Sequence, residues 1–324
     1  MTERGARPAR PGARTGPVLG VGAYLLWGLL PLYLLAAEPA GALEVIAHRI
    51  IWSALLLAPI AAMTKQWASL RRALANPRVL AVLALAGVAL TVNWLVFVWA
   101  VYHHQLVDAA LGYFINPLVS VLLGVAFLGE RLRAAQWAAV AVGAVAVVVV
   151  AFGASSFPVV ALALAGSFGL YGYIEKRVGA GLSAVASLSV ETLVVFPVAA
   201  IYAGVLVARG EGAFLAHGAG HALVMVGLGA ATLAPLLLFN GAARRMPLSV
   251  LGLIQYLCPV MQFITGVLFL REPMPPVRWA GFALVWVALT ILSADAVWRA
   301  RRTVSRRRAA ALAQVSARSP RPGL

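Results

Sequence analysis

The chain has 324 residues, of which 62% are hydrophobic and only 11% are charged, and its mean hydropathy is +0.92. A soluble domain carries about 25% charged residues, and so few charges could not cover so much apolar surface. The composition therefore excludes an ordinary soluble protein and predicts an integral membrane protein.

The formal net charge is +16. The basic residues lie in the two tails and in short gaps between apolar runs, whereas a nucleic-acid-binding protein gathers them in a patch on a folded face. This placement favours topology-setting charge beside anionic lipid and predicts no nucleic-acid partner. The single cysteine, Cys258, excludes an intrachain disulfide and falls short of a metal cluster, so no metal site and no cofactor are expected.

In chain order, residues 1–17 are polar and rich in Arg and Pro, which predicts a disordered basic tail. No small-residue cleavage site follows a short apolar region, so we expect the first apolar run to be an uncleaved insertion signal. A helix needs about 20 apolar residues to cross a bilayer. Such runs predict ten transmembrane helices, at about 18–37, 43–63, 79–102, 108–128, 134–152, 157–174, 185–207, 222–243, 248–270 and 277–297.

The placement of positive charge supports this count. If the N-terminus is cytoplasmic and the helices alternate in direction, 22 of the 26 Lys and Arg residues fall on the cytoplasmic side. A miscount by one helix would destroy this asymmetry. The positive-inside rule therefore predicts both termini in the cytoplasm, with residues 298–324 as a basic cytoplasmic tail.

An internal repeat appears when the chain is shifted by 142 residues, with about sixteen identities over about fifty-five positions. The scarce residue types carry the match: Pro117 falls on Pro259, Glu130 on Glu272 and Trp137 on Trp279. Each unit has five helices, an odd number, so the second copy enters the membrane from the opposite side. The sequence therefore predicts an all-α fold of two inverted repeats, 18–152 and 153–297, an arrangement typical of transporters.

Polar side chains recur at the same level of the two copies. They are Tyr113, Asn116 and Ser120 beside Pro117 in the first copy, and Gln255, Tyr256 and Gln262 beside Pro259 in the second. Proline frees a backbone carbonyl one turn earlier, which lipid tolerates only where the helix faces protein or water. We interpret the two sets as opposing walls of a central polar cavity. The alternative is that the amides hold helices together, at about 1 kcal/mol each.

Charged residues at membrane depth are costly and usually face the protein interior. Glu44 and His48 lie one turn apart near the start of the second expected helix, next to Arg49, and pairing Glu44 with His48 or Arg49 would lower this cost. His48 could titrate near neutral pH, which suits proton coupling, and a structural ion pair is the alternative. Glu191, the most deeply placed acid of the second half, is a candidate proton or cation site.

Three further residues are weaker candidates. Asn93 is a polar side chain inside the third expected helix, and Trp27 and Tyr171, joined by a faint echo of the repeat, could line an aromatic surface or simply pack. Glu130 and Glu272 end their helices at loops, where a cap or a loop ion pair is the expected role. No nucleotide-binding loop and no catalytic constellation is present, so an enzyme is not expected.

Several segments in combination resemble the RarD group of EamA-type proteins, within the drug/metabolite transporter superfamily. They are "GAYLLWGLLPLY" (22–33), "HRIIWS" (48–53), "NWLVFVWAV" (93–101), "LGYFINPLVSVLLG" (111–124), "LGERL" (128–132), "SFGLYG" (167–172), "ETL" (191–193) and "PLSVLGLIQYLCPVMQF" (247–263). The resemblance implies two EamA halves in a bacterial inner membrane and a permease or exporter of small molecules. It also implies that helices 1–4 and 6–9 surround the cavity, with helices 5 and 10 peripheral.

The sequence as a whole predicts a secondary transporter that works by alternating access. The polar sets would shape the substrate site, Glu191 with His48 and Arg49 would be the charged or coupling elements, and Pro117 and Pro259 would provide irregular backbone at the gates. The expected partners are a small-molecule substrate and the lipid bilayer, with proton coupling and a homodimer left open. A membrane sensor or scaffold without flux is the alternative.

Overall fold

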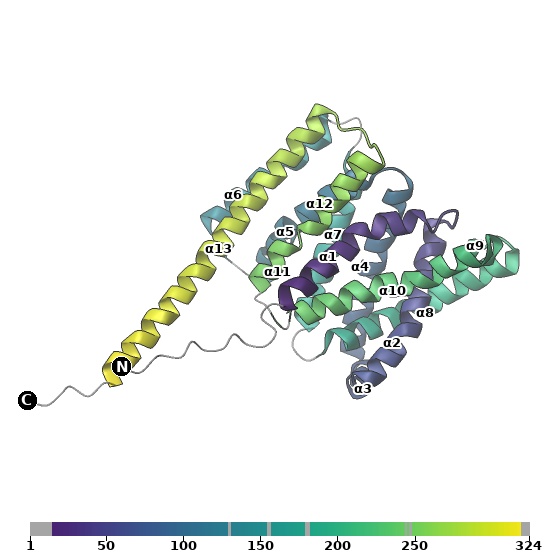
Figure 1. The fold of residues 1–324 in the computed structure, drawn as a ribbon, viewed down its shortest axis with the longest axis horizontal. Coiled ribbons are helices and arrows are strands. Elements are labelled where there is room, and N and C mark those ends of the chain that lie inside the picture. The colour runs from purple at the N-terminus through teal and green to yellow at the C-terminus, as the bar shows by residue number, and fades with distance from the viewer. Residues whose placement is uncertain are drawn as a thin grey trace, which may run out of the picture.

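The computed structural model describes residues 15–128, 131–153, 157–178, 182–243, 245 and 248–318, and its regular elements are all helices over these residues (Figure 1). In order they are α1 (Thr15–Leu35), α2 (Ala42–Met63), α3 (Trp67–Ala75), α4 (Pro77–Tyr102), α5 (Leu106–Leu128), α6 (Ala134–Gly153), α7 (Val159–Val178), α8 (Ala184–Arg209), α9 (Ala213–Ala216), α10 (Gly218–Ala243), α11 (Leu248–Ile254), α12 (Leu257–Ile264), the π-helix η2 (Thr265–Phe269) and α13 (Pro276–Arg318).

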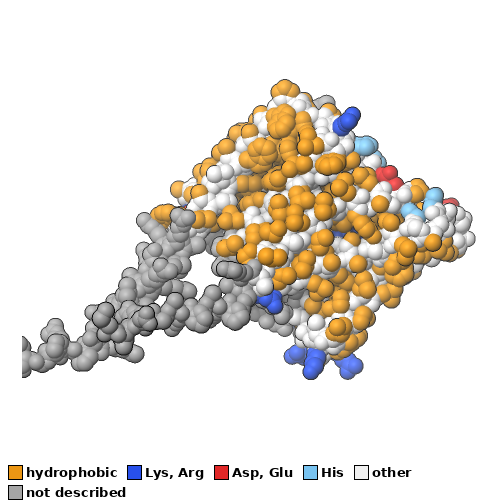
Figure 2. Space-filling model, in the orientation of Figure 1, with side chains coloured by type: hydrophobic (Ala, Val, Ile, Leu, Met, Phe, Trp, Pro, Cys, Tyr) orange, Lys and Arg blue, Asp and Glu red, His pale blue; other side chains and the backbone are white. Residues whose placement is uncertain are grey.

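Eight helices of the described chain are long and apolar enough to cross a membrane: α1, α2, α4, α5, α6, α8, α10 and α13. Two shorter apolar segments, Val159–Glu175 and Leu257–Phe269, fall below that length. Hydrophobic side chains cover the face seen in Figure 2, whereas Lys and Arg gather at the edge where α3 lies. The prediction of an all-α, multi-pass membrane protein is confirmed.

Local capping explains where several helices begin and end. The side chain of Asn76 accepts hydrogen bonds from the backbone N–H of Arg78 and Val79, and proline at the first position of α4 has no N–H to satisfy. Ser183 caps α8 in the same way, and Gly210 ends that helix in the left-handed conformation, at φ 70°.

The last helix, α13, continues to Arg318, into the segment 298–324 that was expected as a basic tail. The structure differs from the expected elements in two further places. Residues 67–75, expected as part of a charged loop, form the short helix α3, which packs Leu70 and Ala73 inward while Arg71 and Arg72 stay exposed. Its shortness and charge hid it from a search for long apolar runs. Its amphipathic pattern is typical of a helix lying at a membrane surface.

The second difference lies in residues 248–270, expected as one continuous helix. The chain breaks at Gln255–Tyr256, between α11 and α12, and then continues as the π-helix η2. Pro259 has no N–H to offer the Gln255 carbonyl, which instead accepts the N–H of Cys258 at 3.2 Å. Its counterpart α5 is continuous despite Pro117.

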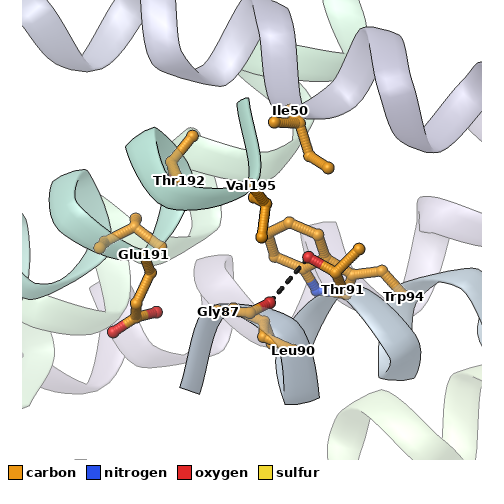
Figure 3. A pocket seen from close by; sticks show the side chains of 9 residues that line it. Ile50, Gly87, Leu90, Thr91, Trp94, Glu191, Thr192 and Val195 are labelled. Carbon is orange, nitrogen blue, oxygen red and sulfur yellow. Dashed lines mark hydrogen bonds between the residues drawn. The ribbon is translucent and has the colours of Figure 1, made fainter. Parts of the chain in front are cut away.

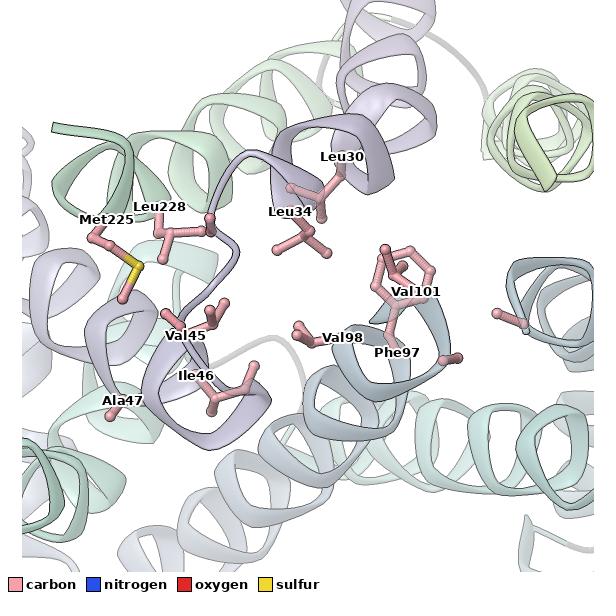
Figure 4. Close-up of a cluster of buried hydrophobic side chains, with 14 of the residues drawn as sticks. Leu30, Leu34, Val45, Ile46, Ala47, Phe97, Val98, Val101, Met225 and Leu228 are labelled. Carbon is pink, nitrogen blue, oxygen red and sulfur yellow. The ribbon is translucent and has the colours of Figure 1, made fainter. Parts of the chain in front are cut away.

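The helices pack in a defined order. α1 lies against α10 and α12, α2 against α8 and α10, α4 against α7 and α8, and α5 against α7, while α6 pairs with α13 at one edge of the bundle (Figure 1). Side chains of α1, α2, α4 and α10 form a shared core that includes Leu34, Val45, Val98 and Met225 (Figure 4). Between helices in lipid, such close packing rather than water exclusion supplies the attraction.

Two glycines 142 residues apart allow close helix crossings. A Cβ atom on Gly87 of α4 would lie 2.8 Å from the Glu191 carbonyl oxygen of α8. A Cβ atom on Gly229 of α10 would lie 2.7 Å from the Trp52 carbonyl carbon of α2. Both distances are too short for any side chain, so these crossings require glycine.

Candidate substrate and coupling site

Arg49 is a buried cation near the middle of the bundle. Its Nε donates to Thr232 Oγ1 at 2.7 Å, and its guanidinium carbon lies 4.2 Å from the centroid of the Trp94 ring. Its Nη1 is buried and has no hydrogen-bond partner. Among the described residues, no carboxylate oxygen lies within 4.0 Å of the guanidinium. Helices α2, α4 and α10 thus hold a positive charge that the described chain does not neutralise.

The ion pair considered for Glu44 is not formed. Glu44 Oε1 instead accepts the backbone N–H of Phe214, in the short helix α9, at 3.1 Å. His48 Nδ1 accepts a hydrogen bond from Trp52 Nε1 at 3.2 Å, and its ring stacks on Phe214 with centroids 4.5 Å apart. An accepting Nδ1 carries no hydrogen, so His48 is neutral in this arrangement. Both residues are therefore occupied by contacts other than the expected one.

Asn93 and Tyr113 form a hydrogen-bonded group between three helices. The Tyr113 hydroxyl donates to Asn93 Oδ1 at 3.2 Å, and Asn93 Nδ2 donates to Leu164 O at 3.1 Å and Ser167 Oγ at 3.0 Å. These bonds connect α5, α4 and α7. Asn93 precedes Trp94, so this network also fixes the ring on which Arg49 stacks.

Glu191 belongs to a pair of acids. The Ser187 hydroxyl oxygen lies 2.6 Å from Glu175 Oε1 and 3.0 Å from Glu191 Oε1. A hydroxyl has one hydrogen and can donate to only one of them, so the other contact requires a proton on a carboxyl group. Glu191 is 2% exposed, and its Oε2 has no partner among the described residues. The arrangement is suited to two carboxyl groups that share a proton.

A small cavity lies between α2, α4 and α8, lined by Ile50, Gly87, Thr91, Trp94 and Glu191 among others (Figure 3). Its volume is about 10 Å³, which is enough for one water molecule. Trp94, which carries the stacked Arg49, and Glu191 both border this cavity. The cavity therefore borders the ring on which Arg49 stacks and one member of the acid pair, whereas Arg49 itself and Glu175 are not among its lining residues.

A larger cavity of about 710 Å³ lies between α4 and α7, and its lining is almost entirely apolar. It is bordered by Leu95, Trp99, Tyr102 and Val160 and contains none of the residues expected to bind substrate. An apolar surface groove of this kind in a membrane protein suits lipid chains rather than a polar ligand.

The polar residues expected to form the two walls of the cavity are only partly hydrogen-bonded. Gln262 is buried, its Nε2 lies 3.2 Å from Cys258 Sγ, and its Oε1 has no partner. Asn116 Oδ1 is also buried without a partner. Gln255 and Tyr256 are half-buried at the break between α11 and α12. Unsatisfied amide oxygens are not working as helix-to-helix hydrogen bonds, which weakens the view that they only hold helices together.

The remaining expected residues lie elsewhere. Ser120 is exposed on α5. Trp27 packs against Tyr24 and Phe239, with ring centroids 5.3 Å and 6.0 Å away. Tyr171 packs against Phe168 at 6.0 Å and lies near the Glu191 carboxyl group. The two aromatic residues therefore belong to separate clusters and do not form one surface.

One end of the bundle is closed by Glu272, in the loop before α13. Its two carboxylate oxygens accept the backbone N–H groups of Leu106 and Val107, at 2.7 Å and 2.8 Å, and so cap α5. Burial raises the pKa of Glu272, although these two bonds act in the opposite direction. Arg278 also pairs with Asp108 here, at 3.1 Å. The expectation that Glu272 caps a helix or joins a loop ion pair is confirmed, and Glu130 lies outside the described residues.

Sequence reasoning missed three residues of the site. Ser187 lies one turn before Glu191 on the same helix, and this spacing could have identified it. Glu175 is the first residue of "EKR" (175–177), which resembles a cytoplasmic charge cluster. Thr232 gave no signal, because nothing in the chain relates it to Arg49 before the helices are packed.

Comparison with known proteins agrees with this fold. Residues 14–152 match the EamA-like transporter family. Protein RarD of Streptomyces exfoliatus is 49% identical over 92% of this chain and 94% of its own length, and protein RarD of Escherichia coli is 37% identical over 90% and 97%. A protein of Vibrio cholerae described as an uncharacterized transporter is 40% identical over 89% and 95%.

A solved crystal structure shares the fold, with a TM-score of 0.54 at 20% identity, and the match covers 87% of this chain and 98% of that one. The RarD relatives confirm, over most of the chain, the resemblance found in the sequence segments. The chain belongs to the RarD group of the EamA-like transporter family, a family of membrane transporters within the drug/metabolite transporter superfamily.

Proposed function

We propose that the protein is a secondary transporter that carries a small molecule across a bacterial inner membrane by alternating access. The observation that carries this proposal is the matched packing of its two halves. Two oppositely oriented copies around one site can exchange inward-open and outward-open shapes, which a sensor or an anchor does not need.

The proposal takes α7 and the α11–α12–η2 segment as spans in addition to the eight longer helices. Ten spans then form two units, one made of α1, α2, α4, α5 and α6 and the other of α7, α8, α10, α11–α12–η2 and α13. With this count Lys65, Arg71 and Arg72 fall on the same side as both tails. The excess of positive charge makes that side the cytoplasm.

Helix packing supports a two-fold relation between these units. Exchanging each helix with its counterpart turns the α4–α7 contact into α10–α1, and the α4–α8 contact into α10–α2, and all four contacts are present. Two close crossings exchange in the same way. Gly87 of α4 packs against α8, Gly229 of α10 packs against α2, and these glycines are 142 residues apart.

The proposed coupling group is the carboxyl pair Glu175–Glu191. Two acids bridged by one serine hydroxyl, one of them the buried Glu191, can bind or release a proton at much lower cost than they can hold two charges. The proposed substrate site lies along α5 and α12, at Tyr113, Asn116, Gln255, Tyr256 and Gln262. The break beside Pro259 gives that wall a flexible backbone at a gate, with Pro117 as its counterpart in α5.

Purified protein in vesicles that enclose a pH-sensitive dye tests this function. A panel of amino acids, nucleosides and cationic drugs is added outside, with and without an imposed proton gradient. We expect at least one compound to move protons and to accumulate only in vesicles that contain the protein. Absence of flux, together with binding of a compound, would instead support the alternative of a membrane sensor.

A further inference from the structure

Arg49 has an unusual combination of burial, charge and unused hydrogen-bonding capacity. It is 3% exposed, and it is the only fully buried Lys or Arg among the described residues. A guanidinium has five N–H donors, and one of them, on Nε, is bonded, to Thr232. An unpaired charge at this depth is strongly unfavourable unless an anion reaches it during the working cycle.

A second unpartnered donor lies on the same face of α2. Ser53 is one helical turn from Arg49 and 2% exposed, and its hydroxyl has no hydrogen-bond partner among the described residues. Residues four apart on a helix are neighbours, so the two unpartnered donors lie on one face of α2. Together they offer a charged donor and a neutral donor, both held in place by rigid helices.

The surroundings fix the guanidinium plane. Trp94 lies against one face at 4.2 Å, and the bond from Nε to Thr232 sets its rotation. The Nη1 edge is left free, and a planar guanidinium edge matches a carboxylate better than it matches a tetrahedral or spherical anion. Tyr113 lies near Arg49. Its hydroxyl donates a hydrogen bond to Asn93 Oδ1, so it carries its proton and adds no negative charge.

The net charge of the site limits the ligand to a monoanion. A dianion such as a phosphate ester would need a second buried cation, and no other described Lys or Arg is buried. A neutral ligand would leave the Arg49 charge uncompensated. A cation would add to it.

We propose that Arg49 and Ser53 form the anchor for the substrate carboxylate, so that the transported compounds are small organic monocarboxylates. This inference rests on the proposed transport function, and it adds Arg49 and Ser53 of α2 to the proposed substrate site as the part that sets the substrate class. Arg49 is then a substrate-binding residue rather than a coupling residue. The acid pair Glu175–Glu191, on α7 and α8, is free to carry the proton.

Binding to the full chain in lipid nanodiscs tests this proposal without a need for transport. The probes are benzoate and hexanoate, each compared with its uncharged amide, benzamide and hexanamide, and the change in tryptophan fluorescence reports binding. We expect at least one carboxylate to bind saturably and at least tenfold more tightly than its amide. If neither carboxylate binds, or if acid and amide bind equally, the proposal is wrong.

Substitutions test whether Arg49 causes the preference for carboxylate over amide. Arg49→Gln should remove the preference for the carboxylate while leaving amide binding unchanged, Arg49→Lys should keep part of it, and Arg245→Gln, at an exposed position, should leave it intact. A retained preference in Arg49→Gln would overturn the assignment. The comparison of acid with amide in the unaltered protein needs no variant, so it decides the matter even if Arg49→Gln does not fold.

The two proposals fail differently. Flux of neutral or cationic compounds without carboxylate binding would leave transport standing and remove this inference. Carboxylate binding without flux of any compound would leave the anchor standing and remove transport.

Discussion

The two halves of the bundle share their packing but differ in chemistry. The first half holds Arg49, a buried cation with no carboxylate oxygen within 4.0 Å among the described residues, and its proline-containing helix α5 is continuous. The second half holds an acid pair, the buried Glu191 with the half-buried Glu175, and its corresponding segment is broken into α11, α12 and η2. The same helix pairs and the same glycine crossings nevertheless occur in both.

This contrast separates the features that the proposed repeat has in common from those in which its two halves differ. Close helix crossings depend on glycine at a single position, so a glycine at the equivalent position gives the same crossing. Charge and backbone breaks depend on individual side chains, and these differ between the halves. We infer that the common packing supplies a movable scaffold and that each half contributes a different part of the chemistry.

The largest expected effect comes from the acid pair. Glu191→Gln should abolish flux driven by a proton gradient, because the amide cannot exchange a proton. The protein should remain folded, since glutamine keeps the shape of the protonated acid. Glu211→Gln, at an exposed loop position, is the matched control in the vesicle assay. Normal gradient-driven uptake by Glu191→Gln would remove this residue from coupling.

The next effect tests the shared packing directly. Gly87→Ala and Gly229→Ala should each lower the free energy of unfolding by about 1–3 kcal/mol, because each new methyl group would overlap backbone atoms of the neighbouring helix. Gly166→Ala meets nothing within 4 Å and should be neutral or slightly stabilising. Unfolding in mixed detergent measures all three. Unequal behaviour of Gly87→Ala and Gly229→Ala would argue against matched crossings.

Most of the helical fold could be predicted from the sequence, but one break in a helix could not. Length, hydropathy and positive charge predicted the helical membrane fold, because crossing a bilayer imposes a length that a single sequence reveals. The break at Gln255 could not be predicted, since Pro117 and Pro259 occupy equivalent positions and only one of them breaks its helix. Packing against different neighbours, α7 for α5 and α1 for α12, is the visible difference.

The site was predicted less completely than the fold. Glu191 and Arg49 could be identified because a charge inside an apolar run is conspicuous. Their partners could not, because Thr232 and Glu175 lie on other helices and meet them only after packing. The expected contact between Glu44 and its neighbours on α2 was wrong because the N–H of Phe214, remote in sequence, was a better partner.

A smaller effect is expected where the loop before α13 caps α5. Glu272→Ala should lower the free energy of unfolding by about 1–2 kcal/mol, because the N–H groups of Leu106 and Val107 lose their acceptors. Glu38→Ala, at an exposed loop position, is the control. Equal stability of the two variants would show that this cap contributes little.

The same residue makes stability depend on pH. Burial raises the pKa of Glu272, so the folded chain holds this proton more tightly than the unfolded chain does. Its contribution is therefore complete below the ordinary glutamate pKa and is lost as the pH rises through the raised value. Relative to Glu272→Gln, which cannot titrate there, the unaltered protein should lose stability as the pH rises above about 4, the ordinary glutamate pKa. A relative gain over that range would contradict the assigned direction.

The most direct test of the central claim is the accessibility of position 116 from the two sides of the membrane. A single cysteine is placed there in the Cys258→Ala background, and a membrane-impermeant thiol reagent is applied from one side of sealed vesicles or from the other. If two inverted halves alternate around this site, Asn116→Cys will react from both sides, with the favoured side reversing when the proton gradient is reversed. Reaction from one side only under every gradient, or from neither, would contradict alternating access.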